Sequence, residues 1–203
     1  MSTAPLKAYK SVKLDVKDSE LRLARGEGEV KLYSNNSSCK YDVSEEGDEL
    51  SIKAKVCEVE LSLQPEAASL ELTAEDSDFK ADHGGLCRTS VEALGSALRL
   101  SLDCLGESDP TVKVKYSSAT LNLAYGELRG RSKISAEAEG SSLTINAAVR
   151  GSTRVTSIVK SNEGSAVNIG FLDVDSSLSG GEGKVVLELS SSDGHVKAKF
   201  SRW

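Results

Sequence analysis

The stretch Leu98-Arg-Leu-Ser-Leu102 alternates strictly between apolar and polar residues, and the same alternation returns in Val112-Lys-Val-Lys-Tyr116 and Leu121-Asn-Leu123. A period of two turns one face of a segment toward a core and the other toward water, as in a half-buried strand. Clusters rich in Gly, Ser, Asp and Asn separate such runs along the chain, and these residue types favour turns. The stretch from 98 to 123 therefore predicts a series of short strands.

The alternation extends over the whole chain of 203 residues. The best candidate for a helical stripe, Thr89 to Leu94, is short, contains β-branched residues and ends at Gly95. We therefore predict an all-β fold. The other alternating runs are Val12–Val16, Leu21–Leu23, Val30–Tyr33, Leu50–Ala54, Val59–Leu63, Leu70–Leu72, Ile134–Ala138, Leu143–Ile145, Val167–Ile169, Val185–Leu189 and Val196–Phe200.

Apolar pairs in the later half recur at intervals of about 20–24 residues, which is typical of repeat architectures. We predict one all-β domain over residues 1–203, with a strand-rich head at about 1–65 and a short β-solenoid of stacked rungs at about 66–203. A two-sheet β-sandwich is the alternative. Charged residues deter edge pairing, so the strand His195–Trp203 and the N-terminal strands with Lys10, Lys13 and Lys17 are expected at the two ends. The recurring pairs begin at Leu98, Leu121, Leu143, Val167 and Leu187.

The chain is acidic, with 25 Lys and Arg, 31 Asp and Glu, and a net charge of −6. This sign disfavours nucleic acid as a partner. The imbalance lies in residues 1–100, which hold 13 basic and 19 acidic side chains, whereas residues 101–203 hold 12 of each. The sequence contains no apolar run long enough to span a membrane and no apolar segment near Met1, so we expect no membrane insertion and a cytoplasmic location.

Cysteines are the least ordinary feature of the composition: Cys39, Cys57, Cys87 and Cys104 are widely spaced, with no Cys-x-x-Cys. That spacing does not support a zinc or thioredoxin-type site. Alternation places Cys39, Cys57 and Cys104 on inward faces, where a free cysteine behaves as a small hydrophobe. Buried free thiols are the favoured interpretation; disulfides stay open, with three possible connectivities.

Six segments near the N-terminus follow one another in a particular order: Glu20-Leu-Arg-Leu, Gly28-Glu-Val-Lys-Leu, Lys40-Tyr-Asp-Val43, Gly47-Asp-Glu-Leu-Ser-Ile-Lys53, Val59-Glu-Leu-Ser-Leu-Gln-Pro65 and Leu70-Glu-Leu72. This order resembles the putative-adhesin, or toastrack, family of unknown function. The resemblance implies an all-β fold in which a strand pair leads into a β-solenoid. It implies no catalytic residue that could be carried over to this chain.

Paired carboxylates are the catalytic candidates in this sequence, because glycosidases on β-helical scaffolds use two of them across a cleft. The i, i+2 pairs are Glu137 with Glu139, Asp173 with Asp175, and Asp76 with Asp78. Aromatic residues, which commonly hold sugars, make up only 4% of the chain. We therefore interpret these pairs as solvated strand faces. Residues 75–78 lack the glycine and spaced ligands of a calcium loop.

The remaining polar motifs predict turns rather than sites. His83 and His195 lie in turn sequences, where a histidine is expected to be solvated, and no Gly-x-Ser-x-Gly occurs. The run Gly180-Gly-Glu-Gly183 lacks the Lys-Ser/Thr pair of a phosphate loop. We assign no catalytic, cofactor-binding or metal-binding residue.

The prediction for function is a non-catalytic binding or assembly module that contacts a protein partner or a second copy of itself, with no cofactor. An exposed sheet edge can add a strand from a neighbour, which suits such a role. The alternative is a carbohydrate-active enzyme on a β-helical scaffold that uses the carboxylates above. A filament-like structural role is a third possibility.

Overall fold

The computed structural model contains only strands, turns and loops in the residues that it describes, and this confirms the all-β prediction. No helix in those segments is long and apolar enough to cross a membrane. The described residues are 2–33, 38–65, 67–86, 88–104, 109–125, 131–149, 154–161, 166–172 and 184–202.

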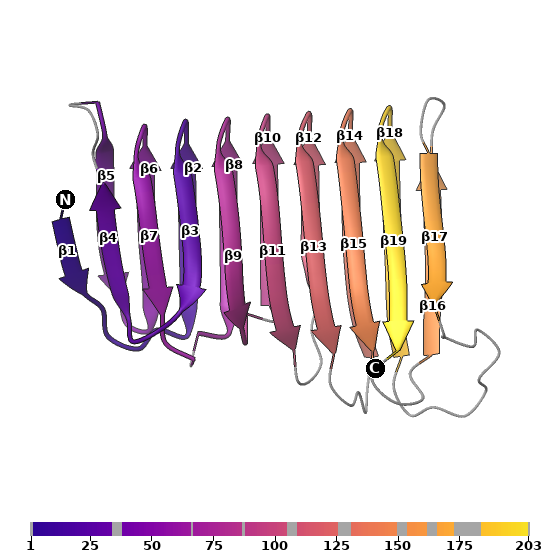
Figure 1. Cartoon of the computed structure of the whole chain (residues 1–203), viewed down its shortest axis with the longest axis horizontal. Helices are drawn as coiled ribbons and strands as arrows, with labels where there is room; N and C mark the ends of the chain where they lie inside the picture. Colours follow the sequence, from indigo (N-terminus) through magenta and orange to yellow (C-terminus); the bar gives the residue numbers. More distant parts are fainter. Residues whose placement is uncertain are drawn as a thin grey trace.

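The strands form two facing sheets that run the length of the molecule (Figure 1). Sheet A has, in spatial order, β1 (Ser2–Pro5), β4 (Glu29–Tyr33), β7 (Glu58–Leu63), β3 (Glu20–Arg25), β9 (Asp78–Gly84), β11 (Ala97–Cys104), β13 (Ser118–Tyr125), β15 (Ser142–Val149), β19 (His195–Arg202) and β17 (Ala166–Leu172). Sheet B has β16 (Arg154–Ser161), β18 (Lys184–Ser192), β14 (Arg131–Glu139), β12 (Thr111–Lys115), β10 (Arg88–Leu94), β8 (Ser69–Glu75), β2 (Ser11–Lys17), β6 (Glu49–Lys55) and β5 (Lys40–Glu46).

The chain passes from sheet B to sheet A through tight corners, so that each rung contributes one strand to each sheet. Neighbouring rungs pair in parallel, as β8 does with β10 and β9 with β11. Antiparallel pairs occur at the N-terminal end, where β1 joins β4, β4 joins β7 and β5 joins β6. The rungs stack as in a solenoid while the sheets face each other as in a sandwich, so the two predicted descriptions apply to different features of one fold.

Near each end of the stack the spatial order of the strands departs from their order in the chain: later strands flank β2 on both sides, whereas β19 enters between two earlier strands. β2 pairs with both β6 and β8, and β19 pairs with both β15 and β17. The prediction that His195–Trp203 and the strand with Lys13 and Lys17 form the edges is therefore wrong for the described strands. Their charges alternate with apolar residues because every strand has one face in water, and Lys13 and Lys17 pair with glutamates on β8.

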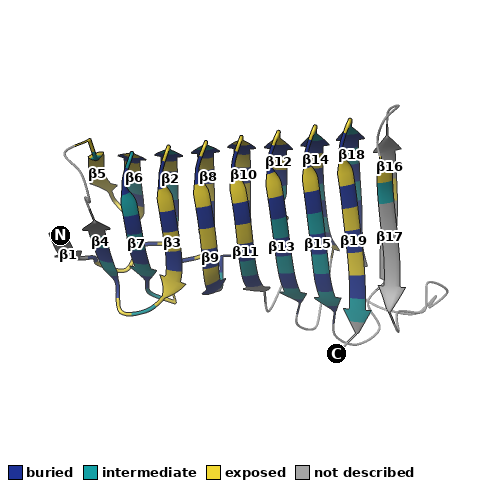
Figure 2. Ribbon diagram, turned by 45° about the horizontal axis from the view of Figure 1, so that its top comes forward, coloured by how far each residue is buried: buried dark blue, intermediate teal, exposed yellow. Residues whose placement is uncertain are grey.

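The core lies between the sheets, and the alternating burial is visible as bands in Figure 2. Leu98, Ala119, Leu143 and Val196 form one inward row, with large and small side chains mixed along it. Three of the predicted repeat positions, Leu98, Leu143 and Val167, share this row. Leu121 lies in the next inward row, so the sequence spacing identified rungs without their exact register.

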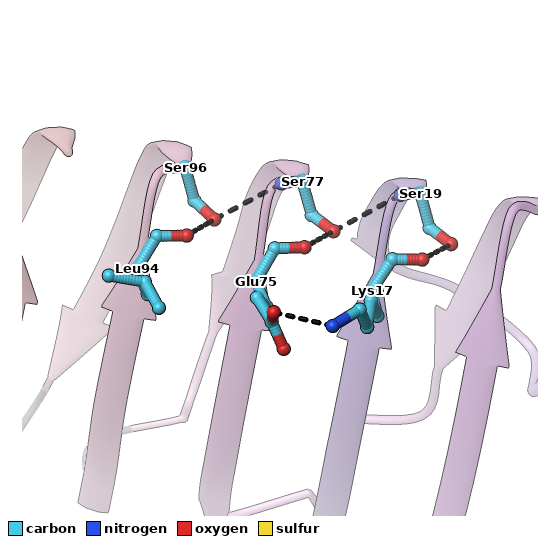
Figure 3. Close-up of polar contacts among 6 residues, drawn as sticks. All are labelled: Lys17, Ser19, Glu75, Ser77, Leu94 and Ser96. Atoms are coloured by element: carbon cyan, nitrogen blue, oxygen red, sulfur yellow. Dashed lines mark hydrogen bonds and ion pairs between the residues drawn. The ribbon is translucent and has the colours of Figure 1, made fainter. Parts of the chain in front are cut away.

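The corners share one backbone shape and, in most rungs, a buried serine. The first corner residue has a positive φ, as in Asp18, Asp76, Gly95, Tyr116 and Gly140. The second is Ser19, Ser77, Ser96, Ser117 or Ser141. Its Oγ donates to the carbonyl two residues earlier and accepts the backbone N–H of the neighbouring rung's corner, as shown for three rungs in Figure 3.

This serine ladder satisfies backbone donors that would otherwise be buried without a partner, which is costly. The distances from corner N–H to the neighbouring Oγ are 3.0–3.1 Å along five consecutive rungs. In the following rung Gly194 holds the position, because a Cβ there would lie 2.7 Å from the Ser141 carbonyl oxygen. The ladder ends at that rung.

Candidate functional site

The cysteine prediction is corrected by a disulfide bond between Cys39 and Cys57, whose Cα atoms lie 4.8 Å apart. The antiparallel pairing of β5 with β6 sets Lys40 opposite Lys55, so the chain just before β5 meets the corner after β6. That hairpin register was the signal in the sequence that could have identified the pair. Cys87 and the side chain of Cys104 lie outside the described residues.

Histidine was predicted to be solvated at both positions, and this is wrong for His83. Its ring is completely buried in β9, with Nε2 3.2 Å from the Gln64 carbonyl oxygen. Burial lowers the pKa of His83 below its ordinary value. The misleading feature was Gly84-Gly85, because β9 continues through His83 and ends only at Gly84. His195 is exposed at the start of β19, as expected.

The carboxylate candidates do not converge on an enclosed site. Glu137 and Glu139 both line an open hollow of about 500 Å³ on the outer surface of sheet B, and Glu139 is 2.8 Å from the Lys115 ammonium. Asp76 lies in a corner whereas Asp78 begins β9, so this pair does not share one side of a strand. Asp173, Asp175 and Gly180–Gly183 lie outside the described residues.

The described segments contain no candidate metal site, because no three His, Cys, Asp or Glu side chains in them are placed to hold an ion. Glu75, the first residue of the segment 75–78, pairs with Lys17.

Sheet B satisfies many of its surface charges across neighbouring strands. The Lys13 ammonium lies 2.7 Å from a Glu71 oxygen, and Lys133 lies 2.8 Å from Glu188. Glu92, beside the hollow, is 3.4 Å from Lys113. Such exposed pairs add little stability each, but they compensate many of the charges on this face.

The outer surface of sheet A changes character along the stack. Toward the N-terminal end, β7, β3 and β9 present a row of acids, Glu58, Glu20 and Asp78. Beyond β9 the outward positions of β11, β13, β15 and β19 are neutral or basic except for Asp103, at the end of β11, and we name their neutral and basic residues the neutral-basic face. It consists of Ala97, Arg99, Ser101, Ser118, Thr120, Asn122, Ala124, Ser142, Thr144, Asn146, Ala148, His195, Lys197, Lys199 and Ser201.

Identical residues face each other in the middle of the neutral-basic face. β13 and β15 both carry the outward sequence Ser, Thr, Asn, Ala, and each residue lies beside its counterpart. The Asn146 amide donates to the Asn122 carbonyl oxygen at 2.9 Å, and Asn122 donates to Ser101 at 3.3 Å. Arg99 continues the threonine row on one side and Lys197 on the other.

Sequence reasoning missed this face because each strand was considered alone. The repeated pattern Ser118-x-Thr-x-Asn122 and Ser142-x-Thr-x-Asn146 was the available signal. The four strands that carry the face contain one acidic residue, Asp103, which is in register with Ala124 at the end of β11.

No family model matches the sequence, and no curated protein matches it. Among solved structures, a putative cell adhesion protein from Clostridium sporogenes is 11% identical, with a TM-score of 0.51 and 98% of each chain covered. A putative adhesin from Parabacteroides merdae is 12% identical, covers 97% of this chain and 94% of its own, and has a TM-score of 0.38. The Clostridium structure has the fold that the sequence resemblance implied; identity this low shows the fold alone.

Proposed function

We propose that this chain is a non-catalytic binding module whose contact surface is an outer sheet face. The observation that carries the proposal is the neutral-basic face, on which Arg99, Lys197 and Lys199 are exposed beside rows of hydroxyl and amide groups. Hydroxyl and amide groups can both donate and accept hydrogen bonds. Because parallel ladders hold these groups in register, little ordering is required when a ligand binds.

Catalysis is the competing function, and Glu137 is the residue on which it would depend. Its partner in the proposed pair, Glu139, already contacts Lys115, whereas a glycosidase requires both carboxyl groups at the scissile bond. The hollow that they line is open on the outer surface of a sheet. These features support binding over hydrolysis.

The catalytic alternative is tested by incubating the wild-type protein with a panel of polysaccharides and measuring reducing ends. We expect the wild type to release reducing ends only at the background rate, and Glu137→Gln and Glu139→Gln to give the same rate. If the wild type releases reducing ends and Glu137→Gln abolishes that release, the chain is an enzyme and the binding proposal is wrong.

The binding surface is tested by placing a carboxylate on each sheet in turn. Immobilised ligand arrays should show binding by the wild type that Thr144→Glu, on the neutral-basic face, removes. Thr73→Glu is the matched control, because Thr73 is exposed on the outer surface of sheet B. Loss of binding in the control and not in Thr144→Glu would contradict the proposal.

Self-association is a second candidate, favoured by the edge strand β5. It pairs on one side only among the described strands, and its Tyr41 is 49% exposed although it lies opposite the buried Ala54. A neighbouring copy could add a strand at this edge. Light scattering coupled to size exclusion should then show a dimer that Tyr41→Lys disrupts; a strict monomer at all concentrations would remove this candidate.

The cytoplasmic location stays a prediction. Disulfides such as Cys39–Cys57 persist mainly in oxidising compartments, with intracellular proteins of hyperthermophiles as the recognised exception. Fractionation of the native source would decide between these settings.

A further inference from the structure

We infer that the neutral-basic face binds an extended carboxylated polysaccharide that lies across the strands, along the axis of the stack. The inference rests on the proposed function, a binding module that uses an outer sheet face, and names the ligand class for that face. Three features carry it: the rows of donors across the strands, the distribution of charge, and the residue types on the face.

The rows across the strands give the direction of the ligand. Arg99, Thr120, Thr144 and Lys197 stand side by side on β11, β13, β15 and β19. Adjacent strands are about 4.8 Å apart, so this row spans about 14 Å with one donor at each step. One strand step is comparable to the advance of one sugar unit in an extended polysaccharide. A second row, Ser101, Asn122, Asn146 and Lys199, runs beside the first.

The distribution of charge on the face indicates the sign of the charge that the ligand carries. The cations Arg99, Lys197 and Lys199 flank the hydroxyl and amide rows, and all three side chains are exposed. Most carboxylates of sheet A, such as Glu20 and Asp78, lie on strands nearer the N-terminal end. Two border the face: Asp82 lies beside Ser101, and Asp103 is in register with Ala124. A net charge of −6 therefore does not describe this face, where Arg99, Lys197 and Lys199 outnumber the acidic residues and Lys197 and Lys199 meet a ligand carboxylate at the β19 side.

The residue types favour a polysaccharide over a single-stranded nucleic acid. Proteins that bind single strands stack the bases on aromatic side chains, and the fifteen residues of the neutral-basic face include only one ring, that of His195. Hydroxyl and amide side chains suit the hydroxyl groups of sugars. Arginine and lysine supply the partners for uronate carboxylates.

The experiment measures binding of the whole chain to polygalacturonate, to its fully methyl-esterified neutral form, and to single-stranded DNA. We expect binding to polygalacturonate that weakens with added salt, and at least about tenfold weaker binding to the neutral form. The double variant Lys197→Glu/Lys199→Glu should bind polygalacturonate at least about tenfold more weakly.

A control variant separates the face from the overall charge. Lys53→Glu/Arg88→Glu makes the same change in net charge at exposed positions on the outer surface of sheet B, and should bind like the wild type. Circular dichroism melting curves of both variants establish that they are folded.

Other outcomes overturn the inference in distinguishable ways. Equal loss of binding in both double variants would assign the effect to net charge, and equal affinity for DNA would remove the polysaccharide as the specific ligand. The wild type could bind the esterified polymer as tightly as polygalacturonate, with Thr144→Glu still abolishing binding. That result would refute the requirement for carboxylates in the ligand, and the proposal of a binding module would stand. Absence of binding to any polysaccharide would refute the ligand class, and the ligand arrays would then test the module alone.

Discussion

The buried serine at each corner decides how tightly neighbouring rungs can stack. A two-residue corner leaves a backbone N–H pointing along the stack, and the Oγ of the next serine accepts it. The same hydroxyl donates to the carbonyl two residues earlier, so donor and acceptor are both used. A small polar side chain fits here because the corners approach closely, and this explains why serine recurs where alternation alone predicts only a turn.

We predict that Ser96→Ala, in the middle of the ladder, destabilises the protein. The variant leaves the Ser77 N–H buried without its acceptor, which costs about 1–3 kcal/mol in the free energy of unfolding. Urea unfolding measures the change. Ser90→Ala, at an exposed position of β10, is the control, and equal effects in the two variants would refute the role given to the ladder.

Protonation of the buried His83 makes the free energy of unfolding depend on pH. Because burial lowers its pKa in the folded state, the unfolded chain binds a proton at this residue once the pH falls below about 6.5, and the folded chain does not. The contribution of His83 to stability is therefore fully present above that pH and is lost as the pH falls toward the folded-state pKa.

We predict that the wild type loses more of its free energy of unfolding between pH 7.5 and pH 5 than His83→Gln does. A glutamine can still donate to the Gln64 carbonyl but does not titrate. Urea unfolding at the two pH values measures the difference. Parallel losses in wild type and variant would show that the pH dependence arises elsewhere.

Among the elements, β5 depends most on a covalent bond. It is the outermost strand of sheet B, and nearly all of its side chains are exposed. The disulfide holds its start against the corner after β6, while Lys7 and Glu45 form a 3.4 Å ion pair near its other end. Exposed ion pairs contribute little to stability. Apart from the backbone hydrogen bonds to β6, the disulfide is therefore the main interaction that holds β5 in place.

We predict that Cys39→Ala/Cys57→Ala lowers the free energy of unfolding by about 3 kcal/mol, the value for a loop of this length. Amide exchange should accelerate in β5 and leave β10 and β12 unchanged. Urea unfolding and hydrogen exchange followed by mass spectrometry measure the two effects. Unchanged protection of β5 in the variant would show that the ladder with β6 holds the strand unaided.

Strands were predictable from the sequence because alternation is a local property. Val112-Lys-Val-Lys coincides with β12, and His195–Phe200 with most of β19. The position of β19 between β15 and β17 was not predictable, because any two rungs of this composition can pair in parallel. The neutral-basic face was hidden for the same reason: it depends on which strands are neighbours, and only the repeated Ser-x-Thr-x-Asn hinted at it.

At the scale of the whole molecule, charge is divided between surfaces. Sheet B pairs many lysines with glutamates, the N-terminal part of sheet A is acidic, and the neutral-basic face retains exposed cations. Two facing parallel ladders hold this pattern in register over many rungs. A long ligand can therefore contact several rungs at once, each through small and similar side chains, and gain affinity from their number.

The most direct test of this account is to map backbone amide chemical shifts in the isotopically labelled protein during titration with galacturonate oligomers. The account predicts shifts confined to β11, β13, β15 and β19, centred on Thr120, Thr144 and Lys197. Shifts centred instead on Glu137 and Glu139 in sheet B would contradict it and direct attention to the hollow that those carboxylates line.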